Sequence, residues 1–431
     1  MHADDALASH RAIDAVWRIE SARIVAVVAR VVRDIGIAEE LAQDALVSAL
    51  EHWPRQGVPD NPGAWLTTAA KRRALDHLRH QRTAQTHHED IAQDLLAQQA
   101  LTMPDFVDAL DAARQDEIGD DLLRLIFTAC HPLLSADARV ALTLKLLGGL
   151  NTQEIARAFL TSEATIAQRI VRAKRTLSEA RVPFELPRGE ALGPRLASVL
   201  EVVYLVFNEG YSATAGADWM RPALCDEALR LGRMLAQLAP EQAEVQGLLA
   251  LMEIQASRTA ARVDATGRPV LLADQDRGRW DRLLIRRGLA ALARAEALAE
   301  PGGPYQLQAA IAACHARAAR PADTDWARIG QLYATLMQVA PSPVVELNRA
   351  VAVSMHVGPA AALPIVDALY GDKMLRQYQW LPSVRGDLLE KLGRRDEARQ
   401  EFEHAAALAG NQREKALLLE RAQRLRDNAQ S

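Results

Sequence analysis

Residues 151–177 constrain the fold most strongly, because they carry the pattern of two short amphipathic helices joined by a tight turn. Their sequence is NTQEIARAFLTSEATIAQRIVRAKRTL. Each half gathers its apolar residues on one helical face, which must be buried. These residues are Ile155, Ala156 and Phe159 in the first half and Ile166, Ile170, Ala173 and Leu177 in the second. The two helices are therefore expected to pack on each other.

The second of these helices carries cations along its length. Leu160, Thr161 and Ser162 form the predicted turn, and the Ser162 hydroxyl can cap the helix by accepting a hydrogen bond from an early backbone N–H. The cations beyond it are Arg169, Arg172, Lys174 and Arg175. A helix of this kind can reach phosphates or base edges in a DNA groove. The alternative is a solvated helical hairpin with no role in binding nucleic acid.

An acidic amphipathic helix is predicted over residues 38–53, AEELAQDALVSALEHW. One side is apolar and ends in Trp53. The polar residues near its start are Glu39, Glu40, Gln43 and Asp44. We expect this turn to face solvent and to suit a basic protein partner.

A further helix is predicted from about Ala64, with the sequence WLTTAAKRRALDHLRHQR from Trp65 onward. Its cations are Lys71, Arg72, Arg73, Arg79 and Arg82. Cations beside an aromatic ring and two threonine hydroxyls suit single-stranded or melting DNA, because charge follows the phosphates while flat and polar groups receive unstacked bases. The alternative is an ordinary surface helix whose Trp65 belongs to the core.

In order and spacing these segments resemble the bacterial sigma factors of the extracytoplasmic-function (ECF) group, the smallest members of the sigma-70 family. Residues 35–53 are similar to the acidic helix of region 2.2, which ends in Trp. Regions 2.3 and 2.4 are matched at Trp65, Leu66, Lys71, Asp76, Leu78 and Arg79. Region 4.2 is matched at Ala164, Thr165, Ile166, Ala167, Gln168, Arg169, Arg172 and Ala173.

The chain departs from the family pattern at several of these positions. Arg72 stands where the family often has Asn. Ala164, Ala167 and Gln168 replace Gly, Lys and Ser. The family's promoter sequence preference is therefore not carried over.

The resemblance implies a chain that binds core RNA polymerase, through its beta-prime and beta subunits, and promoter DNA. Core binding is expected at Glu39, Glu40, Gln43 and Asp44. Contacts near the −10 element are expected at Trp65, Arg72, Arg73, Asp76 and Arg79. Contacts with the −35 element are expected at Thr165, Gln168, Arg169, Arg172, Lys174 and Arg175.

Composition is compatible with this interpretation. A chain of 431 residues is long enough for two to four domains, and a net charge of −4 means that DNA affinity must come from local patches. Cys130, Cys225 and Cys314 lie far apart without metal-ligand or disulfide spacing, which favours a reducing cytosol. The sequence shows neither a signal peptide nor an apolar run of about 20 residues, so we expect a cytoplasmic protein. We expect neither a cofactor nor a metal.

Residues 83–118 are predicted to form an acidic linker with some helix after Met103. In a sigma factor this segment would run through the polymerase towards the RNA exit path; the alternative is a tether without contacts. The cluster of His87, His88, Glu89 and Asp90 is interpreted as solvated rather than metal-binding. The acidic residues are Asp105, Asp108, Asp111, Asp116 and Glu117.

The chain continues well past the length of a minimal ECF factor, and its extension has a helical-repeat pattern rich in Ala and Leu. Near its end, small residues and one Phe stand at the offsets of a tetratricopeptide repeat: Gly386, Gly393, Ala398, Phe402 and Ala405. Residues 348–369 resemble a second, degenerate unit, and residues 223–256 a further helical pair. Whether the repeats form a ring or an open arc is left open.

Two segments of the extension, YLVFNEGY at 204–211 and QDRGRWD at 275–281, resemble motifs of a sigma subgroup with such a tail. A ligand groove or active site is one interpretation. Its residues would be Asn208, Glu209, Tyr211, Asp276, Arg277 and Trp280. The favoured interpretation is structural, with Arg277 paired to acids and Trp280 packed beneath. Motifs for nucleophilic, phosphate-binding or zinc chemistry do not occur, so we expect no enzyme.

The sequence thus predicts an all-α protein with four parts. These are region 2 at 10–82, the linker at 83–118, region 4 at 119–185 and a regulatory repeat domain at 190–431. By resemblance, a small YCII-like protein is a candidate partner of the repeats. The alternatives are a helix-turn-helix regulator that does not bind core polymerase and a helical-repeat adaptor or enzyme.

Overall fold

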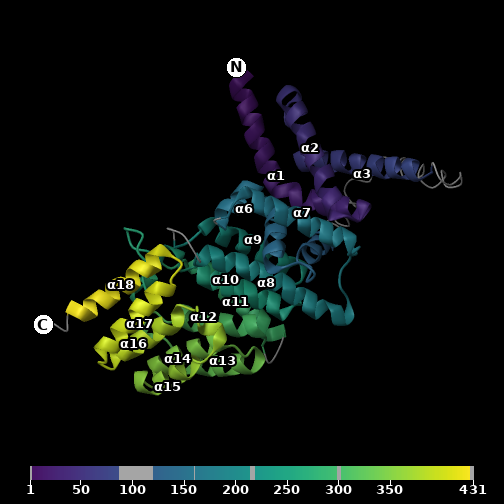
Figure 1. Cartoon of the computed structure of the whole chain (residues 1–431). Helices are drawn as coiled ribbons and strands as arrows, with labels where there is room; N and C mark the ends of the chain where they lie inside the picture. The colour runs from purple at the N-terminus through teal and green to yellow at the C-terminus, as the bar shows by residue number, and fades with distance from the viewer. Residues whose placement is uncertain (1, 87–119, 160, 214–218, 299–301, 428–431) are drawn as a thin grey trace. The chain divides into compact units, whose positions relative to one another are not determined.

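The computed structural model describes residues 2–86, 120–159, 161–213, 219–298 and 302–427. Two compact units divide the chain, Met1–Val202 and Val203–Ser431 (Figure 1). Within the described residues the regular structure is helical, apart from an isolated bridge between Val263 and Pro269. The predicted all-α class is therefore confirmed. From residue 87 onward the predicted linker, with its acidic residues and the His87–Asp90 cluster, lies outside the described residues.

Unit 1 opens with α1 (His2–Val32), α2 (Ile35–Gln56) and α3 (Pro62–Thr86), which pack on one another. The Asp34 carboxylate caps α2 by accepting hydrogen bonds from the N–H groups of Gly36 and Ile37, at 2.7 and 3.0 Å. The Asn61 side chain caps α3 through the N–H of Ala64, at 3.1 Å. Both helices begin earlier than predicted because these caps precede the apolar periodicity.

The second part of unit 1 contains helical residues 120–129, α5 (Ala136–Leu146), α6 (Thr152–Ala158) and α7 (Glu163–Glu179). The predicted helix-turn-helix is formed by α6 and α7. Asn151 and Glu154 make a capping box at the start of α6, and Ser162 caps α7 through the N–H of Thr165, at 3.1 Å, as predicted. The predicted apolar faces are buried, except for a half-buried Phe159.

The division between the units falls within α8 (Leu192–Tyr211). Most of the later helices of unit 2 pack mainly on their neighbours in sequence, as in a repeat array, although one of them packs more closely on the helix two positions earlier. These helices are α9 (Pro222–Leu238), α10 (Ala243–Ala256), α11 (Arg282–Leu298), α12 (Pro304–Arg317), α13 (Trp326–Val339), α14 (Pro343–His356), α15 (Pro359–Leu369), α16 (Trp380–Lys391), α17 (Arg395–Leu408) and α18 (Gln412–Asp427).

The predicted tetratricopeptide-like hairpin is formed by α16 and α17. Phe402 is fully buried, and a methyl group on Gly386 would lie 2.9 Å from its ring. Gly393, in the turn, has a φ of +77°, which favours glycine. The small residues therefore allow the close helix approach that the sequence pattern indicates.

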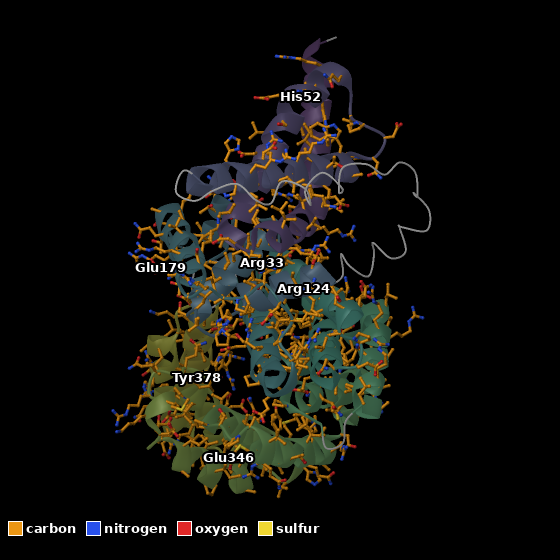
Figure 2. All side chains as sticks on the ribbon, turned by 90° about the vertical axis from the view of Figure 1, so that its right-hand side faces the viewer. Arg33, His52, Arg124, Glu179, Glu346 and Tyr378 are labelled. Carbon is orange, nitrogen blue, oxygen red and sulfur yellow. The ribbon has the colours of Figure 1, made fainter. Side chains whose placement is uncertain are left out.

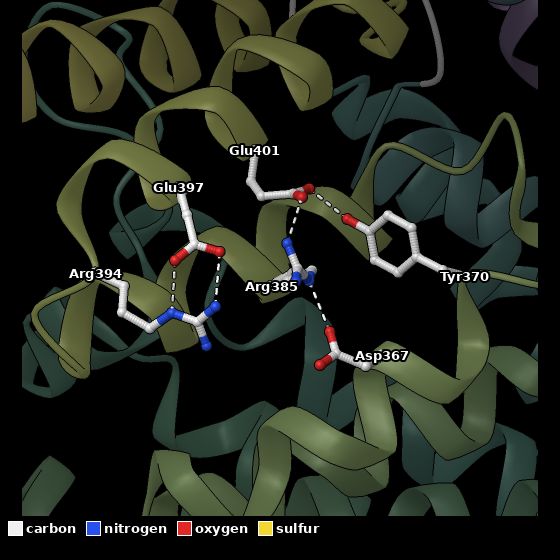
Figure 3. A network of polar contacts seen from close by, with 6 residues as sticks. All are labelled: Asp367, Tyr370, Arg385, Arg394, Glu397 and Glu401. Atoms are coloured by element: carbon white, nitrogen blue, oxygen red, sulfur yellow. Dashed lines mark hydrogen bonds and ion pairs between the residues drawn. The ribbon is translucent and has the colours of Figure 1, made fainter.

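A polar network ties α15, α16 and α17 together (Figure 3). Arg385 of α16 donates hydrogen bonds to Asp367 and to Glu401, both at 2.7 Å. Tyr370 also donates to Glu401. The burial of Tyr370 and the nearby Glu401 carboxylate raise the pKa of the phenol. Three consecutive helices are thereby held in register.

The last helices of unit 2 return to its first loop. Asn411 donates to the carbonyl of Ala213 at 3.3 Å, and the indole N–H of Trp219 donates to Glu414 at 3.0 Å. Arg268 also pairs with a residue of α18, Glu420. These contacts join residues 152 to 198 positions apart and close the array, whereas the sequence pattern left open whether the repeats form a ring or an open arc.

Candidate nucleic-acid and protein interfaces

Two of the predicted −35 cations on α7 pair with acids at the surface. Arg169 lies 3.1 Å from Asp137, and Arg175 donates to Glu179 at 2.6 Å. Asp137, Arg175 and Glu179 are largely exposed and Arg169 is partly exposed, so solvent screens both pairs and they add little to stability. Phosphate oxygens can replace these carboxylates without a large loss of free energy.

The exposed face of α7 also presents groups that can read bases. Thr165 is half-buried, and its hydroxyl is 2.7 Å from that of Ser162. Gln168 and Arg172 are exposed. Val171 is 64% exposed on the same helix, and sequence reasoning missed it. The sequence could have indicated Val171, because it is an apolar residue that lies outside the buried stripe of the helix. An apolar side chain there can contact a thymine methyl group.

Trp65 begins the candidate −10 surface on α3. Its ring is half-buried and packs edge-on against Trp53, with ring centroids 5.5 Å apart. One part of the ring therefore belongs to the core, as the alternative interpretation predicted, and the other part is exposed. The hydroxyls of Thr67 and Thr68 donate to backbone carbonyls one turn earlier, at 2.8 Å each. Their oxygen atoms can still accept hydrogen bonds.

The cations of α3 point in different directions. Arg73 donates to Ser48 of α2 at 2.5 Å, so it supports the packing of the two helices. Arg72 is exposed, and Arg79 is exposed beside Asp76, at 3.2 Å. The Arg82 side chain lies outside the described ones. The exposed face therefore offers Arg72 and Arg79 for phosphate contact.

The prediction that Glu39 of α2 faces solvent is wrong. Glu39 is 4% exposed, with its carboxylate 3.7 Å from the Lys145 ammonium and paired to Lys174 of α7. Gln43 donates to the same carboxylate at 2.9 Å. The cause is long-range, because the two lysines that pair with this carboxylate lie 106 and 135 positions further along the chain. The other three residues are exposed as predicted: Glu40, Gln43 and Asp44.

Further ion pairs join the same two parts of unit 1. Arg18 of α1 lies 2.7 Å from Glu154 of α6. Asp121 is fully buried, 3.4 Å from Arg30 of α1 and 2.6 Å from Arg124, which is labelled in Figure 2. Region 2 and region 4 residues are thus held together by paired charges, some of them buried.

Arg277 of the QDRGRWD segment holds the carboxyl end of α12. Its Nη1 donates to the carbonyls of His315 and Ala318, at 2.7 Å each, and its Nη2 donates to the Thr324 hydroxyl at 3.1 Å. The prediction that Arg277 pairs with acidic side chains is therefore wrong. Instead, the negative end of a helix dipole satisfies the cation. Trp280 is 3% exposed and belongs to the core, as the structural interpretation of the segment expected.

Tyr211, the last residue of the YLVFNEGY segment, contacts a second buried arginine that the sequence did not single out. Arg262 is stacked between the rings of Tyr211 and Trp219, at 3.5 and 4.3 Å from their centroids, and burial lowers its pKa. Arg258 lies 5.8 Å from the Tyr211 ring and 6.0 Å from the Trp280 ring. The two predicted motifs therefore meet through Arg258.

The remaining predicted groove residues have partners within unit 2. Glu209 pairs with Arg221, and Asp276 accepts a hydrogen bond from the N–H of Gly278 at 2.8 Å. Asn208 is half-buried on α8. These contacts give the cluster a structural role. A ligand role for it stays a prediction.

Comparisons with known proteins agree with the division of unit 1 into a three-helix part and a helix-turn-helix part. Residues 18–84 match the family model of sigma-70 region 2, and residues 124–177 match that of sigma-70 region 4. Residues 195–296 match a family of unknown function, DUF6596. An uncharacterized protein of Rhizobium meliloti (strain 1021) is 46% identical over 390 residues, 90% of each chain.

Two mycobacterial sigma factors are similar to a part of this chain. The probable ECF RNA polymerase sigma factor SigI of Mycobacterium tuberculosis is 30% identical over 176 residues, 41% of this chain and 58% of the relative. The ECF RNA polymerase sigma factor SigK of Mycobacterium ulcerans is 30% identical over 166 residues, 36% of this chain and 78% of the relative.

The chain belongs to the sigma-70 family. Within it, this protein is an ECF sigma factor that carries a helical C-terminal extension. In the described part of the chain, none of the helices has the length and apolar character needed to cross a membrane.

Proposed function

We propose that this sigma factor binds core RNA polymerase, recognises −10 and −35 promoter elements and thereby initiates transcription. The observation that carries the proposal is the capped helix-turn-helix of α6 and α7, which follows a basic helix α3 in a chain matching regions 2 and 4. The sigma factor supplies binding and strand separation, and polymerase supplies the chemistry. Such a factor acts in the cytoplasm.

The −35 element would be read by α7. Arg172 is suited to phosphates, Gln168 to an adenine edge and Val171 to a thymine methyl group. Arg169 and Arg175 would exchange their surface carboxylates for phosphates. Lys174 becomes available only when it leaves Glu39.

The −10 element would be engaged by α3. Arg72 and Arg79 are placed to follow phosphates, while the exposed part of Trp65 offers a flat surface for an unstacked base. Arg73 and Asp76 would then act mainly by supporting the helix and by positioning Arg79.

Core polymerase would bind the outer face of α2. Glu40 and Asp44 are exposed, so they can meet a basic surface at once. Glu39 can join them only after Lys145 and Lys174 have moved away from its carboxylate. We infer that regions 2 and 4 separate before or during polymerase binding.

Unit 2 would regulate this process by holding a protein partner. A repeat array presents a continuous surface built from successive helices, which suits protein recognition. A small YCII-like protein remains a candidate partner by resemblance.

Equilibrium binding to core polymerase, measured with the labelled full chain, tests the proposal. Charge reversal at Glu40 and Asp44 together should weaken binding by at least about tenfold, because like charges then face the basic surface. Charge reversal at Glu51, also exposed on α2, is the matched control and should change affinity by less than about twofold. Absence of core binding by the unmodified chain would favour a helix-turn-helix regulator instead.

A further inference from the structure

A groove in unit 2 runs between α9, α10 and α11. Its volume is about 630 Å³, and arginines from two of these helices line it: Arg233 of α9, and Arg287 and Arg294 of α11. None of the three was singled out from the sequence as a candidate site residue. All three are charged side chains that reach the surface, so the groove is open to a partner.

Each arginine is anchored through its Nε atom. Arg233 Nε donates to Glu253 at 2.8 Å, and Arg287 Nε lies 3.4 Å from the other oxygen of the same carboxylate. Arg294 Nε donates to Gln246 at 3.2 Å. Glu253 and Gln246 are 1% and 3% exposed, so both anchors are fixed in the core. Among the described residues, the terminal Nη atoms of the three arginines have no hydrogen-bond acceptor.

This arrangement prepares the guanidinium groups for an external ligand. A buried glutamate holds two of them side by side, which removes much of the side-chain entropy that binding would otherwise cost. The Nη atoms of a guanidinium form a planar fork that matches the two oxygens of a carboxylate. The carboxylates of Asp or Glu side chains in a partner are therefore suitable acceptors for these Nη atoms.

The charge and composition of the groove favour a protein segment over nucleic acid. Glu241 on the wall and Glu253 beneath offset two of the three cations, which leaves one net positive charge. Nucleic-acid binding draws most of its affinity from the neutralisation of several phosphates. Apolar groups continue the lining between the arginines: Ala236, Pro240, Leu249, Ala297 and Leu298.

We propose that this groove binds an acidic segment of a protein partner, with carboxylates on Arg233, Arg287 and Arg294 and apolar side chains on Leu298 and its neighbours. The regulatory meaning of such binding rests on the proposed function of unit 2. The binding itself does not, because neither polymerase nor DNA takes part. A failure of one proposal is thus distinguishable from a failure of the other.

The test is binding of the full chain to an array of twelve-residue peptides that combine Leu with zero to six Glu residues. Affinity should rise with the number of Glu residues and fall as salt is raised. The same peptides with Gln in place of Glu should bind at least about tenfold more weakly, because the charge-assisted hydrogen bonds are lost.

The double variant Arg287→Gln and Arg294→Gln should lose at least about tenfold in affinity for the best acidic peptide. Both substitutions leave the Arg233–Glu253 pair in place, and circular dichroism checks the fold. Arg286→Gln, at an exposed α11 arginine outside the groove, should change affinity by less than about twofold. Affinity independent of Glu content, an unaffected double variant, or tighter binding of inorganic tripolyphosphate than of any peptide would each overturn the proposal.

Discussion

At the scale of single residues, the buried carboxylate of Glu39 lies between Lys145 and Lys174, although its resemblance to region 2.2 implies contact with polymerase. A buried charge is stable only with its partners. Glu39 therefore cannot pair with the two lysines and contact polymerase at the same time. A stronger pairing with the lysines should lower the affinity for polymerase.

Lys145→Gln should strengthen binding to core polymerase. Lys174 still pairs with the buried Glu39 carboxylate in this variant, so loss of the Lys145 contact should cost only about 1 kcal/mol and affinity should rise by about fivefold. Titration of labelled protein with core polymerase measures this change. Arg157→Gln, at an exposed cation of α6, is the control. Unchanged or weaker binding by the Lys145 variant would mean that the Glu39 contact does not oppose polymerase.

His315 should make unit 2 sensitive to acid. Burial, followed by the nearby charges of Arg258 and Arg277, lowers its pKa to about 4 from 6.5. The unfolded chain then binds a proton below pH 6.5 while the folded chain does not, so stability is full above pH 6.5 and falls between pH 6.5 and 4. The loss amounts to at most about 3 kcal/mol.

Urea unfolding at pH 7.5 and pH 5 measures this loss. His315→Gln should reduce the difference between the two midpoints, whereas His356→Gln, at an exposed histidine of α14, should leave it unchanged. An equal pH dependence in the His315 variant and the unmodified chain would exclude His315 as its source.

At the scale of elements, α7 was predictable because its apolar stripe, its Ser162 cap and its cations all lie within one short segment. The helices α2 and α3 begin before their predicted starts, because Asp34 and Asn61 cap them ahead of the residues that carry the apolar periodicity. The burial of Glu39 and the stacking of Arg262 were not predictable, because both depend on partners distant in sequence.

The outer face of α7 should determine sequence preference. Gln168→Ala should relax selection at one base pair of the −35 element by about 1–3 kcal/mol, because an amide that pairs with a base edge is lost. Arg172→Ala should weaken binding almost equally at all sequences. Transcription from a randomised −35 library measures both effects. Thr176→Ala, exposed near the end of the helix, is the control. Identical preferences in all variants would contradict base reading by α7.

The α16–α17 hairpin should not tolerate a side chain at Gly386. A Cβ atom there meets the Phe402 ring at 2.9 Å, so Gly386→Ala should destabilise unit 2 by about 1–3 kcal/mol. Gly371→Ala, where nothing lies within 4 Å of the added atom, should cost less than about 0.5 kcal/mol. Urea midpoints of the two variants compare the effects; equal values would mean that the close approach is not needed.

At the scale of the whole molecule, the chain combines an ECF sigma factor in unit 1 with a closed helical array in unit 2. Contacts such as Asn411 with Ala213 join the two ends of that array. The first part of α8 packs on unit 1, where Arg195 donates to the carbonyl of Phe127 at 2.7 Å. A chain ending at Glu185 therefore loses some packing of unit 1 together with unit 2.

We propose that this protein directs polymerase to promoters. In vitro transcription with core polymerase and the full chain, on genomic fragments that include its own upstream region, tests it most directly. We predict discrete, promoter-specific transcripts that core polymerase alone does not produce. Absence of such transcripts both with the full chain and with the chain ending at Glu185, together with absent core binding, would mean that the protein does not act as a sigma factor.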